Sequence, residues 1–300
     1  MVEKNLIIAK LRLGLEKDRG DFNLIIPPSH QKFNQPVIKA QAHFSQLSDS
    51  KNEKVDYLVL KTSATPFPKL HNLGEALLST KSWSLREGES GNYTLFAKED
   101  IPPRLAIINH DFTEGDLFFG PLRKYQDIYP PGELEIRLFS VWLARFGDII
   151  LHASGVVKDG KGYCFLGEAG AGKSTLARIL FLDPSVTVLG EDTLILRYID
   201  GYFWIFGTPW HLDPDYCSPL GVKLEKIFYL DRFKPKGIKL VSPIEALSYI
   251  LKTAIIPFYH PYWLSKVLEN LERLSDSLGM YTMSYQLNDC VWGLLYDHMM

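Results

Sequence analysis

The sequence predicts an α/β fold in residues 131–300, preceded by a β-rich region over residues 1–130. Two observations lead to this fold class. Residues 163–181 pass from a short apolar run through a glycine-rich segment into a helix-like pattern, the order of strand, loop and helix in α/β proteins. Before residue 130, short apolar runs alternate with turn-type residues, which suits antiparallel strands rather than βαβ units.

In the N-terminal region, Leu11, Leu13 and Leu15 alternate with other residues, as in a strand with one buried face. The other strands expected there cover residues 24–26, 36–44, 56–61, 83–86, 93–97, 105–109 and 117–119. Turn-type residues separate them, as at 87–92. The region contains no catalytic motif, and we expect its aromatic residues to belong to a core.

The C-terminal region begins after the break Tyr-Pro-Pro-Gly at 129–132. Asp159-Gly160 and Asp200-Gly201 predict hairpin turns, because this dipeptide tolerates positive φ. Ser242 is placed to cap a helix that opens on a proline. The expected strands are 148–157, 163–166, 186–189, 194–198, 202–206, 226–230 and 280–286. The expected helices are 133–146, one with Ser174 and Thr175 in its first turn and a stop at Asp183-Pro184, one from 243, 262–275 and 288–298.

The composition limits the class of protein. A chain of 300 residues, 46% of them hydrophobic, suits one large domain or two ordinary ones. The 33 basic and 35 acidic residues nearly cancel, so the net charge gives no case for nucleic acid or an anionic membrane as partner. No apolar run approaches the roughly 18 residues of a membrane span, and the N-terminus lacks a signal-peptide pattern.

The three cysteines, Cys164, Cys217 and Cys290, are far apart and form no C-x-x-C pair. Disulfides and a structural zinc site are therefore not expected, and a reducing cytoplasm is the expected location. Each cysteine is expected to act as a small buried hydrophobe rather than a nucleophile.

The glycine-rich segment fits G-x-x-x-x-G-K-[ST], the Walker A phosphate loop. Its glycines let successive N–H groups converge on phosphate oxygens, and the following helix adds its positive end. Lys173 would bring a charge to the β and γ phosphates, and the Ser174 hydroxyl would bind Mg²⁺. The alternative, a glycine-rich turn that binds nothing, fits the flanking strand and helix patterns less well. The residues expected to bind a nucleoside triphosphate are Gly167, Glu168, Ala169, Gly170, Ala171, Gly172, Lys173, Ser174 and Thr175.

Phosphoryl transfer also needs a carboxylate for the metal and a group that orients the acceptor. Glu191-Asp192 follows a short apolar strand, and strand ends open onto the phosphate side of an α/β sheet. One acid could bind Mg²⁺ while the other accepts a hydroxyl proton; the alternative is a solvated acidic turn. His152 lies one hairpin upstream of the loop and could be a site residue or a buried, hydrogen-bonded strand histidine.

The segment Thr208-Pro209-Trp210-His211 follows the second hairpin. It could line a nucleotide or acceptor pocket, whereas Trp210 could equally belong to the core. His211 is a weaker candidate for the site.

Together, the histidine-bearing strand, the hairpin, the phosphate loop and the acid pair resemble the catalytic domain of the HPr kinase/phosphorylase family. The resemblance is strongest over residues 148–200 and is closest to uncharacterised HPr-kinase-like proteins, which share Leu-His-Ala-x-Gly-Val, the loop followed by Lys-Ser-Thr-Leu-Ala, and Gly-Thr-Pro-Trp. It implies a P-loop kinase domain related to phosphoenolpyruvate carboxykinase, with ATP as nucleotide and assembly into homo-oligomers.

By the same resemblance, Lys173 binds phosphate, Ser174 binds Mg²⁺, Glu191 matches the general base and Asp192 the acid that holds His152. The sequence departs from the family in four respects. Glu191 stands where the family usually has Asp, and Ala153 where it typically has Gly; residues 1–130 do not look like the family's N-terminal domain, and no phosphorylase signature is recognised.

The sequence thus predicts an ATP-dependent kinase that uses Mg²⁺ to transfer the γ-phosphoryl group to a hydroxyl, on a protein serine or a small metabolite. The alternative is an ATP-binding or ATP-hydrolysing partner that gates another protein, such as a peptide-modifying enzyme. A GTPase and a transporter ATPase fit less well, because Asn-Lys-x-Asp and Leu-Ser-Gly-Gly-Gln are absent from the sequence.

Overall fold

The computed structural model describes residues 4–8, 11–19, 34–35, 56–63, 68–69, 73–99, 103–120, 133–211, 213–258, 260–286 and 291–299. The chain divides into two compact units, Met1–Phe139 and Ser140–Met300. The strands expected at 24–26 and 36–44, the break at 129–132 and Cys290 lie outside the described residues.

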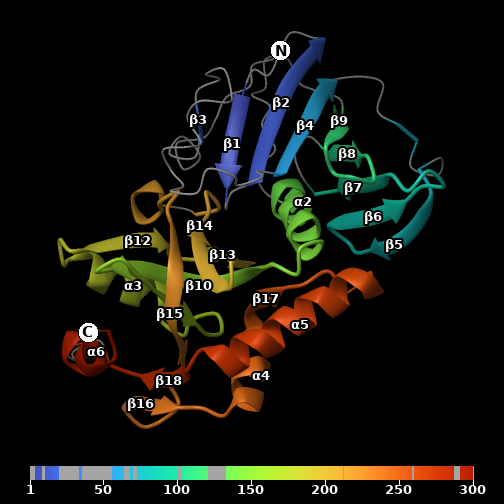
Figure 1. The fold of residues 1–300 in the computed structure, drawn as a ribbon. Helices are drawn as coiled ribbons and strands as arrows, with labels where there is room; N and C mark the ends of the chain where they lie inside the picture. The colour runs from blue at the N-terminus through green and yellow to red at the C-terminus, as the bar shows by residue number, and fades with distance from the viewer. Residues whose placement is uncertain are drawn as a thin grey trace. The chain divides into compact units, whose positions relative to one another are not determined.

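The first unit is built on one nine-stranded sheet, in the order β3-β1-β2-β4-β9-β8-β7-β6-β5 (Figure 1). Its strands are β1 (Lys4–Ile8), β2 (Leu11–Arg19), β3 (Asn34–Gln35), β4 (Asp56–Ser63), β5 (Glu75–Ser79), β6 (Trp83–Glu87), β7 (Tyr93–Ala97), β8 (Arg104–Ile108) and β9 (Glu114–Phe119). From β5 to β9 neighbours in the chain pair antiparallel, as the short apolar runs predict.

The purely antiparallel prediction for this region is wrong at two pairings. β2 pairs with β4, and β4 with β9, in parallel. Two parallel neighbouring strands need a long connection that returns the chain to the same end of the sheet. The connection from β4 to β9 contains the whole β5–β8 meander. Consecutive residues of β6, β7 and β8 are buried, so apolar side chains on both faces of the sheet contribute to the core of this unit. Leu85 and Leu95 lie on one face and Leu105 on the other.

Helix α2 (Glu133–Ala144) spans the division between the units. The second unit then contains both strands and helices. They are β10 (Ile149–Lys158), β11 (Lys161–Leu166), α3 (Lys173–Phe181), β12 (Val186–Gly190), β13 (Thr193–Ile199), β14 (Tyr202–Gly207), the 3₁₀ turn η3 (Pro214–Tyr216), β15 (Gly221–Leu230), β16 (Gly237–Leu240), α4 (Pro243–Thr253), β17 (Ala254–Ile255), α5 (Pro261–Ser277), β18 (Met280–Ser284) and α6 (Val291–Met299).

The strand pairings of the second unit close into a ring, β11-β10-β13-β14-β15 and back to β11. β18 and β16 extend the sheet beyond β15. Both hairpin predictions are confirmed: Asp159 and Gly160, and Asp200 and Gly201, have positive φ between paired antiparallel strands. The predicted cap is also present, because Ser242 and Glu245 form a capping box on α4.

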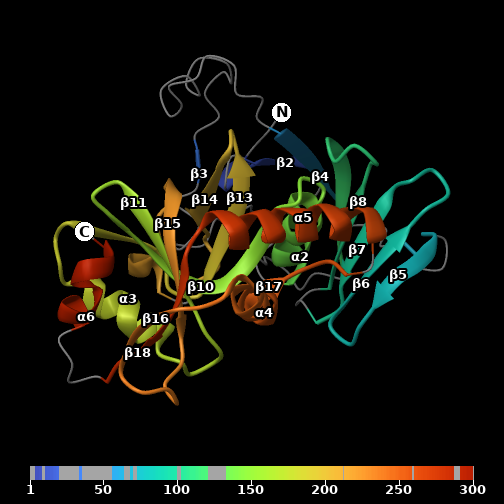
Figure 2. The same ribbon diagram turned by 60° about the horizontal axis from the view of Figure 1, so that its bottom comes forward.

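Helices cover both faces of this sheet (Figure 2). On one face α3 and α6 pack in a cluster with strand residues that include Phe165 and Phe228. On the other face α4 contacts the sheet, with the ring of Tyr249 stacked 4.0 Å from that of Tyr229. Helix α5 contacts α4 and crosses it, since α4 is seen nearly end-on in Figure 2 while α5 runs across the view. The second unit is therefore a layered α/β structure, as the sequence predicts.

Candidate functional site

Several strands of the second unit have their C-terminal ends at the end of the sheet where the glycine-rich loop begins. β11 and β12 both pair antiparallel with β10, so they run in the same direction. β15 runs parallel to β11, and β18 runs parallel to β15. The residues that follow these strands, Gly167, Glu191, Asp231 and Tyr285, therefore come to the same end of the sheet, beside the loop.

The loop from Gly167 to Gly172 joins β11 to α3, as predicted. Gly170 and Gly172 have φ of 77° and 102°, conformations that favour glycine. A Cβ atom at Gly172 would lie 2.9 Å from the hydroxyl oxygen of Tyr285. The strand–loop–helix geometry thus requires glycine where the sequence has it, and phosphate binding by this loop stays a prediction.

Lys173 is the first residue of α3, and its side chain is buried. Its Nζ donates hydrogen bonds to the carbonyl oxygens of Gly167, at 2.8 Å, and Glu168, at 3.1 Å. Burial lowers the pKa of Lys173, and the negative charge of Asp192 raises it in part. The ammonium group is therefore held inside the loop, within electrostatic range of one acid of the predicted pair.

Three hydroxyl groups fix the start of α3 by donating to main-chain carbonyl oxygens. The Ser154 hydroxyl donates to Lys173 (3.2 Å), the Ser174 hydroxyl to Glu191 (3.2 Å) and the Tyr285 hydroxyl to Gly172 (3.0 Å). These bonds tie β10, the acid pair and the end of β18 to the loop. Ser174, the predicted magnesium ligand, thus lies directly beside the acid pair.

His152 and Asp192 form a close pair. His152 Nδ1 lies 3.1 Å from Asp192 Oδ1, and the Ala153 N–H donates to the Asp192 carbonyl at 2.9 Å. The hydrogen bond with His152 is the main cause that lowers the pKa of Asp192, although burial acts in the opposite direction. The structure therefore brings together the histidine and the second acid, as the resemblance implied.

Glu191 has different surroundings from its neighbour. Its side chain is only 6% exposed, against 53% for Asp192. Arg178 of α3 donates to Glu191 Oε2 through Nε at 3.2 Å and approaches it through Nη2 at 3.1 Å. Glu191 thus holds a side chain of α3, and its predicted part as general base or metal ligand stays a prediction.

The segment after β14 lies close to the acid pair. Thr208 Oγ1 donates to the Thr193 carbonyl at 2.9 Å and lies 3.3 Å from His211 Nε2. A Cβ atom at Gly190 would lie 2.7 Å from the His211 ring, so glycine at the end of β12 lets this ring approach. Trp210 is buried. The charge of His211 contributes to lowering the pKa of Asp192.

The structure adds residues that the sequence patterns did not indicate: Ser154, Arg178, Arg232 and Tyr285. Arg232 Nη1 lies 3.4 Å from the Gly170 carbonyl oxygen, although the two residues are 62 positions apart in the chain. Only the pairing of distant parallel strands brings Arg232 and Tyr285 to the loop, and no local motif carries that signal. Ser154 lies on β10 and Arg178 on α3 itself. The Tyr285 hydroxyl is 113 positions from its partner Gly172.

Cys164 and Cys217 are both buried free thiols. Burial raises the pKa of Cys164 to about 12, which disfavours the thiolate. Across the described ranges, no three His, Cys, Asp or Glu side chains gather as a metal site. The same part of the chain contains no helix with the length and apolar character needed to span a membrane.

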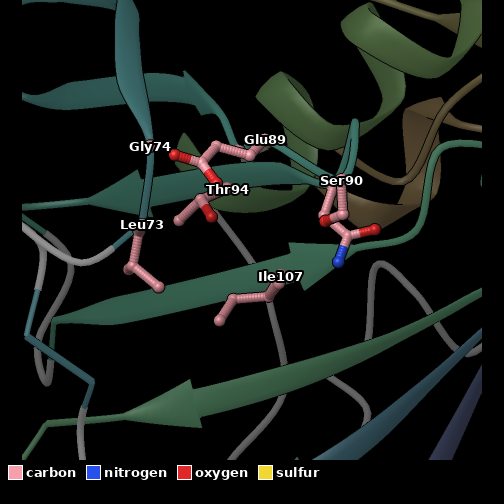
Figure 3. Close-up of a pocket in the computed structure, with 8 residues that line it drawn as sticks. Leu73, Gly74, Glu89, Ser90, Thr94 and Ile107 are labelled. Carbon is pink, nitrogen blue, oxygen red and sulfur yellow. The ribbon is translucent and has the colours of Figure 1, made fainter.

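A pocket of about 500 Å³ lies in the first unit (Figure 3). Leu73 and Gly74 line it from one side of the view, and Thr94 and Ile107 come from β7 and β8. A second, apolar hollow of about 430 Å³ runs along α4 between Ile244 and Lys252. No predicted site residue lines either of them.

The sequence matches no protein-family model. It also matches no curated protein. Among solved structures, the chain is similar to the Hpr(Ser) kinase/phosphatase from Coxiella burnetii, with 14% sequence identity and a TM-score of 0.28 over 50% of this chain and 89% of that chain.

Proposed function

We propose that this protein is an ATP-dependent phosphotransferase that moves the γ-phosphoryl group to a hydroxyl, with Mg²⁺. One observation carries the proposal: a glycine-rich loop between β11 and α3 holds the Lys173 ammonium group within electrostatic range of Asp192. Cations that bind phosphate and a carboxylate that faces the acceptor are the parts that phosphoryl transfer requires.

In this proposal the loop binds the triphosphate. Main-chain N–H groups at the start of α3 would point at phosphate oxygens, and the helix end adds a positive potential. Lys173 would exchange its two carbonyl partners, Gly167 and Glu168, for phosphate oxygens. The exchange is favourable because a charged acceptor forms a stronger hydrogen bond than a neutral one.

Mg²⁺ would be held by oxygen atoms, which are the ligands it prefers. The Ser174 hydroxyl and the Asp192 carboxylate offer such oxygens at the loop, and the Ser174 hydroxyl already lies 3.2 Å from the Glu191 carbonyl oxygen. The donor set therefore fits Mg²⁺. When bound, the ion would neutralise charge on the phosphate oxygens.

We assign the orientation of the acceptor hydroxyl to Asp192 rather than Glu191. Asp192 is 53% exposed, so an acceptor can reach it, whereas Arg178 and burial occupy Glu191. His152 holds Asp192 by one oxygen, Oδ1, and helps to keep it ionised. An ionised, oriented carboxylate can accept the hydroxyl proton as the bond to phosphorus forms.

The test is a transfer assay with γ-labelled ATP and Mg²⁺, against a cell extract and a panel of hydroxyl metabolites. We expect label in an acceptor with the wild type and none with Lys173→Ala. Lys239→Ala, at an exposed position on β16, is the matched control and should transfer label as the wild type does.

Each result has a defined meaning. Release of ADP and free phosphate without a labelled acceptor would favour an ATP-driven partner protein over a kinase. Equal activity of the wild type and Lys173→Ala would refute the assignment of the loop. Thermal unfolding of each variant shows whether the fold survives, so that a lost activity is read only from folded protein.

A further inference from the structure

The chain that follows β15 begins at the same end of the sheet as the glycine-rich loop. β15 runs parallel to β11, with Leu166 opposite Tyr229 in the register. The residues after Leu230 therefore emerge beside Gly167, the first residue of the loop. Any side chain from this connection that turns toward the loop lies next to the place proposed for the triphosphate.

The connection after Leu230 has a defined conformation. The Asp231 N–H donates to the Met283 carbonyl of β18 at 3.0 Å, which fixes the turn to the sheet. The Phe233 N–H donates to Asp231 Oδ1 at 3.1 Å, and the Lys234 N–H donates to the Asp231 carbonyl at 3.2 Å. Arg232 therefore projects from a backbone that three hydrogen bonds hold in place.

The guanidinium group of Arg232 lies against the loop. Its Nη1 is 3.4 Å from the Gly170 carbonyl oxygen, which is a long and therefore weak hydrogen bond. Its Cζ lies 5.0 Å from the centroid of the Phe233 ring, a cation–π contact. Phe233 is 86% exposed, so its ring contributes little to a core, and the guanidinium of Arg232 lies over it.

Arg232 and Lys173 differ in what their charges contact. Lys173 is buried and bonded to two loop carbonyls. Arg232 is exposed, and among the described residues its five N–H groups make the single long bond to Gly170. A guanidinium presents paired donors that match phosphate oxygens, and it stays charged at all physiological pH values.

We infer that Arg232 is a second phosphate-binding cation of this site, which contacts the triphosphate of ATP from the side of the loop that Gly170 forms, with Phe233 holding its orientation. The inference rests on the proposed function, because it needs a triphosphate in the loop. It adds to that function a group from a separate part of the chain, which makes nucleotide affinity depend on the turn after β15.

The test measures the affinity of the whole chain for Mg²⁺-ATP and for Mg²⁺-tripolyphosphate by calorimetry. Arg232→Gln should weaken both by about 10- to 100-fold, the range for a charge-assisted hydrogen bond. Arg232→Lys should recover part of the lost affinity, because lysine keeps the positive charge but lacks the paired N–H donors of the guanidinium. Phe233→Ala should weaken both ligands by a smaller factor, on the order of threefold, because it only releases the guanidinium.

Arg273→Gln is the matched control, since that exposed arginine lies on α5 against Asn270 and Tyr198. It should bind both ligands as the wild type does. If Arg232→Gln binds both ligands as tightly as the wild type while Lys173→Ala binds neither, the inference is overturned and the loop assignment stands. A loss for ATP alone, with tripolyphosphate unaffected, also overturns it, because Arg232 would then act on the nucleoside. Failure of the wild type to bind either ligand refutes the proposed function itself.

Discussion

The two ends of helix α3 are held in place by different chemistry. At the N-terminal end, the hydroxyls of Ser154, Ser174 and Tyr285 each donate to a main-chain carbonyl oxygen. At the C-terminal end, Arg178 pairs with Glu191, and the ring of Phe181 meets that of Tyr216 edge-on at 5.2 Å. Lys158 pairs with Asp183 directly after the helix, at 3.2 Å.

This difference separates charges that stabilise the fold from charges that remain available to a ligand. At the C-terminal end the cations and carboxylates are paired with one another, Arg178 with Glu191 and Lys158 with Asp183. At the N-terminal end, neutral groups fix the backbone, which leaves the charges of Lys173 and Asp192 near each other at the loop. Substitutions at the two ends should therefore affect different measurements, activity at one and stability at the other.

Asp192→Asn should show the largest effect on activity. The amide cannot accept a proton, so transfer should fall by about 100- to 1,000-fold, within the range for a lost general base. The variant also loses the ionic partner of His152, but because Asp192 is half-exposed, the free energy of unfolding should fall by no more than about 1 kcal/mol. The assay is the rate of label transfer beside chemical denaturation of the same samples.

The magnesium dependence of the Asp192→Asn variant distinguishes two possible roles of this side chain, orientation of the acceptor and binding of the metal. An unchanged Mg²⁺ requirement for ATP binding would mark Asp192 as the group that orients the acceptor. A higher requirement would mark it as a metal ligand. If Asp192→Asn transfers label at the wild-type rate, Asp192 takes no part in the reaction. The assignment of activity to Asp192 and of stability to Glu191 would then be wrong.

Glu191→Gln should show the reverse pattern. The side chain is nearly buried and Arg178 is half-exposed, so losing the charge weakens a partly buried ion pair. We expect a loss of about 1–3 kcal/mol in the free energy of unfolding, the range for a buried polar group that loses a charged partner. Transfer at a temperature where the variant is folded should stay within about threefold of the wild type. A transfer loss of about 100-fold with unchanged stability would instead identify Glu191 as the base.

The C-terminal end of α3 also illustrates what the sequence could and could not predict. Periodic apolar residues predicted α3 and its end near Asp183, because the helical repeat is a local property. The pairing of Arg178 with Glu191 depends on how α3 packs on β12, which no local pattern encodes. Arg232 and Tyr285 reach the loop only through the parallel pairings β11–β15 and β15–β18.

Short strands were missed for a related reason. β5 and β16 lie at sheet edges and have mostly exposed or half-exposed residues, so they lack the alternation by which a strand is recognised. By contrast, the hairpins at Asp159-Gly160 and Asp200-Gly201 were predictable, because the turn chemistry lies in two adjacent residues. Local chemistry is therefore readable from the sequence, whereas the partners that fix the site come from topology.

Tyr285→Phe tests the N-terminal end of α3 by removing one of its neutral hydrogen bonds. The hydroxyl donates to the Gly172 carbonyl at 3.0 Å, and burial raises its pKa, so it remains protonated as a donor. We expect a loss of about 0.5–1.5 kcal/mol in the free energy of unfolding, the net value of one such bond. The affinity for ATP should change less than in Arg232→Gln, because Tyr285 holds the loop without carrying charge. An unchanged free energy of unfolding would show that the hydroxyl bond does not fix this end.

Asp183→Asn, at the other end, should have the smallest effect at neutral pH and a distinctive pH dependence. Hydrogen bonds from Ser185, then one from Lys158, lower the pKa of Asp183 to about 2 from its ordinary 3.8. A carboxylate with a lowered pKa in the folded state stabilises the fold above the unfolded-state pKa, and this contribution is lost as the pH falls through the folded-state value. The thermal midpoint of the wild type should therefore exceed that of Asp183→Asn at pH 7, and the gap should narrow as the pH falls from about 4 toward 2.

The control is Asp276→Asn, which removes an exposed carboxylate on α5. The difference in thermal midpoint between this variant and the wild type should narrow less over that interval. A gap between the wild type and Asp183→Asn that stays constant across the interval would mean that the charge of Asp183 does not stabilise this end of α3.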